Sequence, residues 1–500
     1  MKRQILLISC LFISAALDAT QVEQYSVFEL ELKGPSAGNP FTGVQMSAEF
    51  RLMNRSLFCE GFYDGDGIYR IRFMPDEPGN WTYITKSNIK EMDLKKGSFT
   101  CVAAASGNHG PVKVRNTFDF GYADGTPFYP VGTTCYAWVH QPEELVNETL
   151  ATLKKTAFNK IRMTVMPKNY DVYINNEPPF YPFEGSKDKG WDFFRPNPEF
   201  FRNFEQKILE LQKLGIEADV ILFHPYDWGK WNFDKMNTEQ AVFYLRYLIA
   251  RIAAYRNVWW SMANEYDIMR KTDQEWEKYF RVIQSYDPYS HLRSIHNGME
   301  WYNHSLPWIT HLSIQTAYLE DIQDWRELYR KPVIIDECVY EGNVPNDWGN
   351  LTPEEMVNRF WISYCRGAYC THGETYIHPE NILWWSKGGK LYGKSPERIA
   401  FLHKIMTETP LEGVYPHHSI WNKETYLIKD NEFYLHYYGN SQQAKARLYL
   451  PKNIRFRLEV IDTWNMTVTP VNGEFSGMIE IPLPGLPYIA VRATALNGNK

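Results

Sequence analysis

The sequence predicts an α/β protein in which a central (β/α)8 barrel stands between two β-sandwich domains. Three observations support this fold class. Short apolar runs alternate with helical stretches through the middle of the chain, and short alternating runs broken by turns occupy both flanks. No glycine-rich phosphate loop opens any predicted helix, which argues against a doubly wound nucleotide-binding sheet. We expect a leader at residues 1–19, sandwiches at 20–105 and 413–500, and the barrel at 110–412.

Composition narrows the classes of function. The 500 residues are enough for about three domains. A net charge of −6 offers no basic field for phosphates, so nucleic acid is not an expected partner. Aromatic residues reach 16% of the chain, and flat rings with a polar tip suit the faces of sugars. Composition therefore hints at a carbohydrate ligand.

The first residues read as a secretory signal. Met1–Arg3 is positively charged, Ile5–Ile13 is almost wholly apolar, and small residues follow at Ser14–Ala16. We expect an exported protein, periplasmic or extracellular, with no membrane span. Leu7–Cys10 also resembles a lipoprotein acylation box, so lipid anchoring stays open as an alternative. Six further cysteines contain no Cys-x-x-Cys pair, and a Cys59–Cys101 disulfide or buried free thiols are both possible.

The first flank contains a clear hairpin. Phe58–Tyr63 and Ile68–Phe73 are strand-like, and Asp64–Gly67 between them is a turn. This Asp-Gly-Asp-Gly stretch lacks the further ligands of a calcium loop. The small residues 103–108 mark the boundary to the barrel.

The barrel pattern is clearest around residue 200. Apolar residues from Phe200 to Leu214 mark one face of a helix over Pro198–Leu214, and Gly215 ends it before the next strand. Eight candidate strands follow this logic: Phe128–Gly132, Lys160–Val165, Glu217–Phe223, Val258–Met262, Leu292–His296, His311–Gln315, Pro332–Asp336 and Gly367–His372. In such a barrel, function gathers at the carboxyl ends of the strands.

The last part of the chain returns to β structure. Turns are predicted at Asp430–Asn431 and Pro470–Gly473. The candidate strands are Thr425–Ile428, Phe433–Tyr438, Ala446–Leu450, Arg455–Ile461, Gly477–Ile481 and Tyr488–Arg492.

Two glutamates lie where predicted barrel strands end. Asn264-Glu265 closes the fourth strand, and Asp336-Glu337 closes the seventh. Opposed carboxylates can cleave a glycosidic bond, because one protonates the leaving oxygen while the other attacks the anomeric carbon. Asp336 and Glu341 are alternatives to Glu337, but Asp336 should point to the opposite side of its strand, and Glu341 lies beyond the strand end.

These residues resemble the clan A glycoside hydrolases, the family 5-like group of (β/α)8 enzymes. A closer resemblance is to bacterial polysaccharide-degrading proteins with an N-terminal β domain of unknown function and a C-terminal β domain. It rests on three stretches, 254–265, 336–342 and 371–376, and covers nearly the whole mature chain. One departure concerns the eighth strand, which in the best-known family 5 enzymes leads promptly to a Trp and here leads to His372 and Glu374.

The resemblance implies a role for each matching residue. Glu337 would be the nucleophile and Glu265 the acid and then the base of a retaining mechanism. Arg162 matches the family's arginine near the nucleophile, Tyr318 its aromatic residue after the sixth strand, and Asn264 the residue that binds the sugar 2-hydroxyl. The family's chemistry needs no metal and no cofactor, and the scattered histidines of this chain contain no His-Glu-x-x-His motif.

Other substrate-binding candidates follow strand ends or lie in late loops, and each has a structural alternative. Trp138, with Tyr136 and His140, and His224, with Tyr226, could line the pocket or pack loops. His296 could bind hydroxyl groups or be a satisfied core histidine. Glu374 could belong to the site or anchor a loop, and Trp385 could stack on sugar or be half core.

The sequence as a whole predicts an exported retaining glycosidase acting on an oligosaccharide or polysaccharide of plant or host origin. The long segment Lys168–Pro198 suggests a walled pocket and therefore exo action. The alternative is a barrel that binds glycan without catalysis, although both carboxylates are present. Sugar identity, anomeric configuration and oligomeric state are not encoded in any motif.

Overall fold

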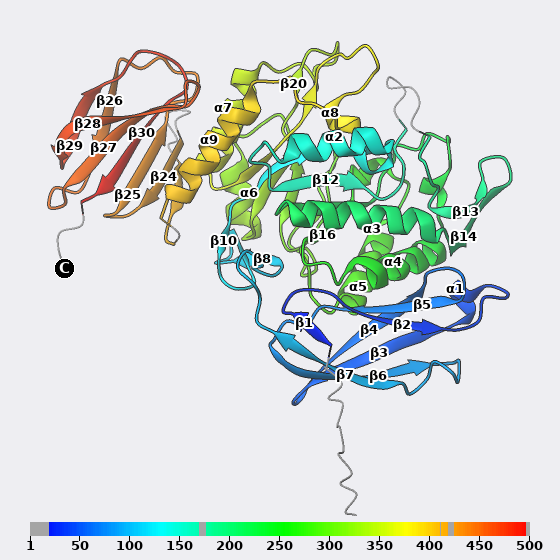
Figure 1. Cartoon of the computed structure of the whole chain (residues 1–500). Helices are drawn as coiled ribbons and strands as arrows, with labels where there is room; N and C mark the ends of the chain where they lie inside the picture. The colour runs from blue at the N-terminus through cyan, green and yellow to red at the C-terminus, as the bar shows by residue number, and fades with distance from the viewer. Residues whose placement is uncertain (1–19, 170–176, 411, 419–424, 497–500) are drawn as a thin grey trace, which may run out of the picture.

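The structure, a computed structural model, describes residues 20–169, 177–410, 412–418 and 425–496. The predicted leader at 1–19 lies outside these ranges. A central barrel stands between two β domains. In Figure 1 the N-terminal domain lies below the barrel, and the C-terminal domain lies at its upper left. The predicted fold class is confirmed.

The N-terminal domain is one sheet folded over on itself. Its strand order is β1-β7-β6-β3-β4-β5-β2. Phe28 on β2 stacks on Phe99 of β7 at 4.2 Å between ring centroids, although the two strands are far apart in this order. The sheet therefore closes as a sandwich around an aromatic core. The elements are β1 Gln21–Glu23, β2 Phe28–Lys33, α1 Pro40–Gly43, β3 Met46–Leu52, β4 Arg55–Tyr63, β5 Ile68–Phe73, β6 Gly79–Ser87 and β7 Lys96–Val102.

Buried charges join this sandwich to two helices of the barrel, α3 (Pro198–Lys213) and α4 (Thr238–Ile252). Arg251 of α4 is fully buried and contacts Asp64 at 2.9 Å and Glu205 of α3. Arg72 of β5 contacts Glu205 at 3.0 Å and donates to the Arg251 carbonyl oxygen. Each charge has an opposite partner, so this contact is a specific interface.

A small antiparallel sheet precedes the barrel and corrects one predicted strand. It comprises β8 Val112–Arg115, β9 Asp119–Tyr122 and β10 Pro127–Phe128. Phe128 pairs with Phe120 of β9, whereas the first barrel strand is β11, Val131–Thr134. The predicted strand Phe128–Gly132 therefore spans two elements. Pro130 separates them because proline has no N–H to donate.

The barrel strands follow the expected parallel order, β17-β16-β15-β12-β11-β21-β19-β18. A parallel bridge between His296 and Ser313 closes the ring between β17 and β18. The strands are β11, β12 Lys160–Thr164, β15 Glu217–Phe223, β16 Val258–Ala263, β17 Arg293–Ser294, β18 Leu312–Gln315, β19 Val333–Glu337 and β21 Tyr369–His372. Strand β17 is shorter than the predicted Leu292–His296.

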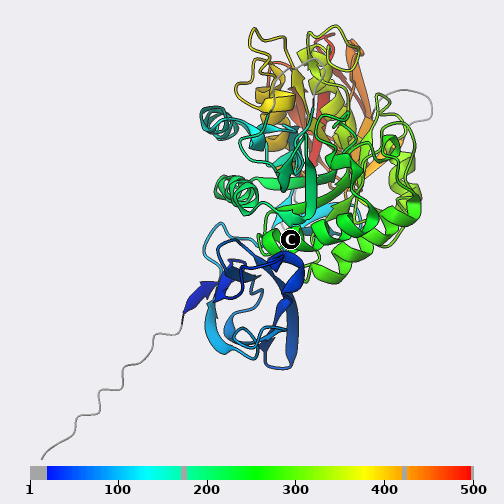
Figure 2. The same ribbon diagram turned by 90° about the vertical axis from the view of Figure 1, so that its right-hand side faces the viewer.

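Helices surround the barrel, as the view turned by 90° about the vertical axis shows (Figure 2). The predicted helix at residue 198 is α3; Asn197 caps its first turn, and Gly215 follows it with φ of 71°, a left-handed conformation that favours glycine. The helices are α2 Glu143–Leu153, α3 Pro198–Lys213, α4 Thr238–Ile252, α5 Asp273–Tyr286, α6 Ile322–Tyr329, α7 Pro353–Cys365, α8 Trp384–Lys387 and α9 Ser395–Glu408.

Short elements decorate the loops at the carboxyl end of the barrel. The long segment after β12 contains an antiparallel hairpin, β13 Phe183–Ser186 and β14 Gly190–Pro196. Beyond β19 and β21 the chain pairs again as β20 Glu341–Gly342 and β22 Glu374–Thr375. Short 3-10 turns occur at Trp138–His140, Phe233–Lys235 and Tyr266–Ile268.

The C-terminal domain has a six-stranded sheet, β23-β24-β25-β30-β27-β28, and a β26-β29 hairpin. The predicted turn Pro470–Gly473 is wrong, because these residues lie within β28, where Pro470 is in register with Glu459. The strand is at the sheet edge, where a missing N–H is tolerated. The strands are β23 Tyr415–His418, β24 Thr425–Lys429, β25 Phe433–Tyr437, β26 Lys445–Tyr449, β27 Phe456–Asp462, β28 Thr467–Phe475, β29 Met478–Pro482 and β30 Ile489–Ala495.

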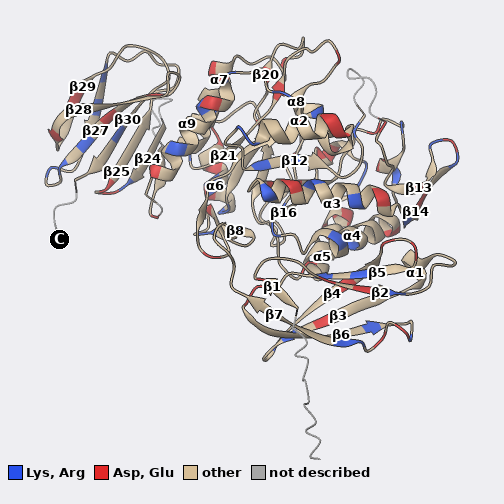
Figure 3. Cartoon of the chain, in the orientation of Figure 1, with Lys and Arg blue, Asp and Glu red and all other residues tan. Residues whose placement is uncertain are grey.

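The surface and the cysteines fit this organisation. Basic and acidic side chains are interspersed along the chain (Figure 3). The six cysteines from Cys59 to Cys370 are free and buried, so Cys59 and Cys101 are not bonded to each other. Among the described residues, no helix combines the length and the apolar character that crossing a membrane requires.

Candidate active site

Glu265 stands at the carboxyl end of β16 in an unusual backbone conformation. Its φ of 45° and ψ of 58° are left-handed, which costs a non-glycine residue about 1–2 kcal/mol. Flanking hydrogen bonds hold it there: Asn264 N donates to the Phe223 carbonyl, and Tyr266 N to the His296 carbonyl, both at 3.0 Å. The neighbouring strands thus fix the direction of the Glu265 side chain.

Glu337 ends β19 and is 5% exposed. Its Oε1 accepts a hydrogen bond from the Tyr136 hydroxyl and lies 3.3 Å from His296 Nε2 and 3.5 Å from Arg162 Nη1. Burial alone would raise the pKa of Glu337, but His296, Arg162 and Tyr136 together hold it well below its usual range. Glu337 is therefore an ionised carboxylate at neutral pH.

The environment of Glu265 has the opposite effect. Burial, followed by the negative charge of Glu337, raises the pKa of Glu265 to about 7. Gln315 Nε2 donates to Glu265 Oε1 at 3.0 Å, and Gln315 Oε1 lies 3.2 Å from His296 Nε2. A side-chain bridge of Gln315 and His296 thus links the two glutamates.

Asn264 offers a hydrogen-bond donor beside the pair. Its Oδ1 accepts from Arg162 Nη2 at 2.8 Å, which fixes the amide. Within the part of the chain that is described, its Nδ2 has no partner, and the residue is 1% exposed. A buried donor without a partner is costly, so this N–H group is suited to a bound ligand.

Lys168 reaches the site from the segment after β12. The side chain is 3% exposed, and its Nζ lies 3.7 Å from the Tyr136 ring centroid and 3.8 Å from that of Tyr226. The Trp385 ring is 5.2 Å away. Burial lowers the pKa of Lys168 to about 7, and the negative charges of Glu337 and Glu265 oppose that shift.

Beneath the glutamates, the barrel interior holds further charges. Lys160 Nζ contacts Asp219 at 2.8 Å and Asp336 at 2.7 Å. Asp336 was predicted to point to the opposite side of its strand from Glu337, and this prediction is wrong. Both carboxylates lie near Arg162, at 4.0 Å for Asp336 and 3.5 Å for Glu337. The pairing of β18 with β19 skips Asp336 at this point, which brings two successive residues to the same side.

Several predicted site residues gather around the pair. Arg162, Asn264 and His296 make the contacts described above. Trp385 lies half-buried at the edge, with its ring 5.9 Å from that of Tyr136 and 5.7 Å from that of Tyr340. These four candidates share one site with Glu265 and Glu337.

Three other candidates do not reach it. Tyr318 is 73% exposed on a loop turned by a hydrogen bond to Thr316. Trp138 is completely buried in the hydrophobic core because its 3-10 turn faces inward. His224 uses both ring nitrogens on backbone, 3.1 Å from the Met166 carbonyl and 3.2 Å from Tyr226 N, so it supports the loops instead of the ligand.

Glu374 belongs to a second cluster, outside the catalytic pair. Its oxygens accept the N–H groups of Tyr392 and Gly393, which makes it a loop anchor. Glu341 and His372 lie close by, and the three residues could hold a metal ion, with ligand atoms within 4.8 Å of one another. Hydrogen-bond donors already surround the Glu341 carboxylate, among them Lys394 N, Ser395 N and the Tyr376 and Ser395 hydroxyls, so both carboxylates of the cluster have partners without an ion.

Sequence reasoning missed three members of the site. Lys168, Gln315 and Tyr340 were not among the candidates, and for Tyr136 and Tyr226 both a role in the pocket and a role in loop packing were left open. Gln315 ends the sixth strand and Tyr136 follows the first, so the strand-end rule could have found them. Lys168, Tyr226 and Tyr340 lie in loops, where their direction depends on tertiary structure.

Comparison with known proteins places this geometry in a family. The profile of the apiosidase-like catalytic domain matches residues 115–423, more than half of the chain. The chain belongs to the apiosidase-like family. Its flanks match two domains of unknown function, DUF5060 at 21–88 and DUF5605 at 421–494. No match was found among curated proteins.

Solved structures agree with the assignment to the apiosidase-like family. A Bacteroides vulgatus ATCC 8482 protein, provisionally described as a glycoside hydrolase, is 40% identical, with a TM-score of 0.91 over 95% of this chain and 100% of that one. A glycoside hydrolase family 5 protein of the same organism has a TM-score of 0.63 at 15% identity, over 77% of this chain and 94% of the other, which shows a shared fold. The apiosidase-like chain is thus a glycosidase with a carbohydrate substrate.

Proposed function

We propose that this glycosidase works by a retaining double displacement, with Glu337 as nucleophile and Glu265 as acid and base. One observation carries the proposal. Two glutamates, at the carboxyl ends of strands β16 and β19, have environments that separate their pKa values, one well below the usual range and one raised to about 7. Such a separation assigns an ionised nucleophile and a protonated acid at the same pH.

In the first step, Glu337 Oε1 attacks the anomeric carbon while the bond to the leaving oxygen breaks. The proton of Glu265 passes to that oxygen. Arg162, His296 and Tyr136 keep the attacking carboxylate ionised and oriented. In the second step, Glu265 accepts a proton from water, the water oxygen bonds to the anomeric carbon, and the bond to Glu337 breaks.

Asn264 and Trp385 bind the substrate in this proposal. The Nδ2 donor of Asn264 hydrogen-bonds the 2-hydroxyl, a contact that strengthens as positive charge develops on the sugar. The half-buried Trp385 ring supplies an apolar face for stacking. Neither role requires a metal.

We propose exo action that releases a terminal sugar from a plant or host glycan. The hairpin β13–β14 lies in the segment after Lys168, which would form one wall of the pocket. The name of the matching family makes apiose, a branched pentose, the first sugar to test. Cleavage inside a long polymer would contradict the exo assignment.

We further propose that the protein is exported. The support is the charged, apolar and small-residue order of the first nineteen residues. Amino-terminal sequencing of the protein secreted by its host, expected to begin near residues 17–20, tests this. An intact Met1 terminus on cytoplasmic material would contradict export.

The test of the mechanism uses the purified mature chain on a panel of plant and host glycans and aryl glycosides, apiosides included. Glu337→Gln and Glu265→Gln should each lower release by a factor of about 10³ or more, while Glu144→Gln on the exposed face of α2 should not. The first product seen by NMR should keep the anomeric configuration. An inverted product, or activity that survives Glu337→Gln, would refute the mechanism, and binding without release would indicate a glycan-binding protein.

A further inference from the structure

We infer that Lys168 is the positioning residue that makes Glu265 change from acid to base between the two steps. The inference rests on the proposed function, because it concerns the same two glutamates. It is carried by the placement of the Lys168 ammonium group between aromatic rings beside the pair, and by the balance of charges in the barrel interior.

Local structure fixes the position of Lys168. Asn169 N donates to the Tyr226 carbonyl at 2.8 Å, and His224 Nε2 lies 3.1 Å from the Met166 carbonyl. These contacts tie the segment after β12 to the segment after β15. The ammonium group therefore lies between the rings of Tyr136 and Tyr226, from two different strand ends.

The aromatic surroundings affect what Lys168 can do. Ring faces attract a cation without neutralising it, so its charge acts on the nearby carboxylates. Its charged neighbours are Glu337, Glu265 and Arg162, and the ring of His224 is close enough to be influenced by its charge. The Tyr136 phenol remains neutral, because burial raises the pKa of Tyr136 well above the usual range.

Before the reaction, the interior charges of the described residues balance if Glu265 is protonated and Lys168 is cationic, as it is below its pKa of about 7. The carboxylates of Asp219, Asp336 and Glu337 face three cationic side chains, Lys160, Arg162 and Lys168. An ionised Glu265 would add an unmatched negative charge in a buried site, where the charge of Asp267 also raises the pKa of Glu265, so ionisation is unfavourable. The free enzyme therefore holds the proton that the leaving group needs.

Esterification of Glu337 removes one negative charge and leaves the cations in excess by one. Loss of the Glu265 proton to the departing oxygen restores the balance, so Glu265 is then ionised and ready to accept a proton from water. Without Lys168, the intermediate would be balanced with Glu265 protonated. The second step would lose its base, while the first step would keep its acid.

This asymmetry can be measured with a nitrophenyl glycoside that the parent enzyme hydrolyses. Its leaving group needs little protonation, so hydrolysis of the intermediate limits kcat. Lys168→Met should lower kcat about 10- to 100-fold, with a smaller change in kcat/KM. Azide, an anionic nucleophile that needs no general base, should restore most of the lost turnover and yield a glycosyl azide.

A matched set of variants separates charge from packing. Lys168→Arg keeps the charge and should retain most of the kcat, and Lys189→Met, an exposed lysine of the same segment, should behave like the parent. The alkaline limb of the kcat/KM profile should move to higher pH in Lys168→Met, because Glu265 loses a cation that lowers its pKa. A merely structural role would produce neither the azide response nor the shift.

The inference and the mechanism fail in different ways. Trapping with a 2-fluoro glycosyl substrate should add one sugar mass to the parent at Glu337, and absence of this adduct would refute the proposed function. If the adduct forms but Lys168→Met keeps parental kcat, or loses activity that azide does not restore, only the inference about Lys168 is refuted. If Lys168→Met does not fold, an unchanged alkaline limb in Lys168→Gln would refute it equally.

Discussion

Glu217 provides a test of the electrostatics of the barrel that is independent of substrate. It is the first residue of β15, is 4% exposed, and accepts a hydrogen bond from Trp259 Nε1 at 2.9 Å. Burial is the main reason that its pKa is raised to about 8, and Trp259 and Arg256 only partly oppose this. The folded protein therefore binds a proton at Glu217 that the unfolded chain releases at a lower pH.

The sign of the effect follows from this difference. Between about pH 4.5 and pH 8, the unfolded state carries fewer protons at this position, so the free energy of unfolding falls as pH rises. Each pKa unit corresponds to 1.36 kcal/mol, which sets an upper bound of about 5 kcal/mol, and relaxation around the charge makes about 2–3 kcal/mol a realistic loss. Glu217→Gln removes the titration and keeps an acceptor for the Trp259 N–H.

The measurement is the melting temperature between pH 5 and pH 9. Glu217→Gln should match the parent near pH 5 and exceed it by several degrees at pH 9, because about 1 kcal/mol shifts the Tm of a large domain by about 2–4 °C. Glu144→Gln, on an exposed part of α2, should follow the parent at every pH. Equal melting curves for the parent and Glu217→Gln at pH 9 would refute the reasoning.

Two further predictions concern the domain contact and the substrate. Arg251→Met should destabilise the protein by about 3–5 kcal/mol, since it removes the buried cation that Asp64 and Glu205 share and leaves them with contacts such as those to Arg70 and Arg72. Arg281→Met at the surface should change Tm by less than about 2 °C, and equal effects in differential scanning calorimetry would contradict the buried network. Asn264→Ala should lower kcat/KM about 100-fold on a glycoside with a 2-hydroxyl and much less on its 2-deoxy analogue, and an equal loss on both would exclude the proposed contact.

The sequence predicted the repeating part of the fold well, because periodicity and helix ends are local signals. Glu217–Phe223 is the strand that was predicted, and α3 differs from its prediction by one residue. The errors occur where tertiary position overrides local chemistry. The C-terminal strands β23 and β28 both contain proline and were missed, since an edge strand tolerates a residue that reads as a turn in isolation.

The candidate site was predictable to the extent that it depends on strand ends. Glu265, Glu337 and His296 follow or end a barrel strand, Arg162 lies within β12, and the structure brings the four together. The aromatic partner of the nucleophile was not predictable in this way. Several tyrosines follow strands, and the choice of Tyr136 over Tyr318 depends on how one loop turns.

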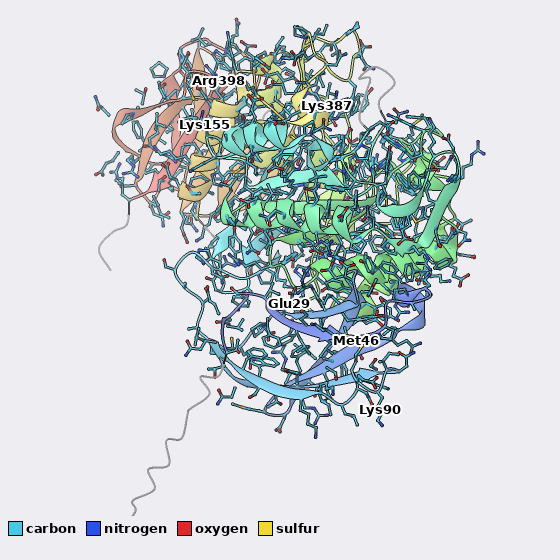
Figure 4. All side chains as sticks on the ribbon, turned by 45° about the vertical axis from the view of Figure 1, so that its right-hand side comes forward. Glu29, Met46, Lys90, Lys155, Lys387 and Arg398 are labelled. Carbon is cyan, nitrogen blue, oxygen red and sulfur yellow. The ribbon has the colours of Figure 1, made fainter. Side chains whose placement is uncertain are left out.

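The structure also separates the site from the N-terminal domain. Lys387 lies in α8, the helix that also carries Trp385, at the opposite end of the molecule from Lys90 (Figure 4). The N-terminal sandwich therefore contacts the barrel through α3 and α4 and contributes none of the groups described around Glu337.

The closure of the barrel between β17 and β18 has a consequence for ligand binding. This seam consists of one bridge, His296 to Ser313, and a few side-chain bonds such as Gln315 N to Asn297 Oδ1 at 3.0 Å. The same two strands carry His296 and Gln315, which link the catalytic glutamates. A sugar that orders these side chains should also stabilise the contact between β17 and β18, which has only this one bridge between strands. Amide hydrogen exchange along residues 293–297 and 312–315 should therefore slow when substrate binds, and the enzyme should be most rigid while it holds its substrate.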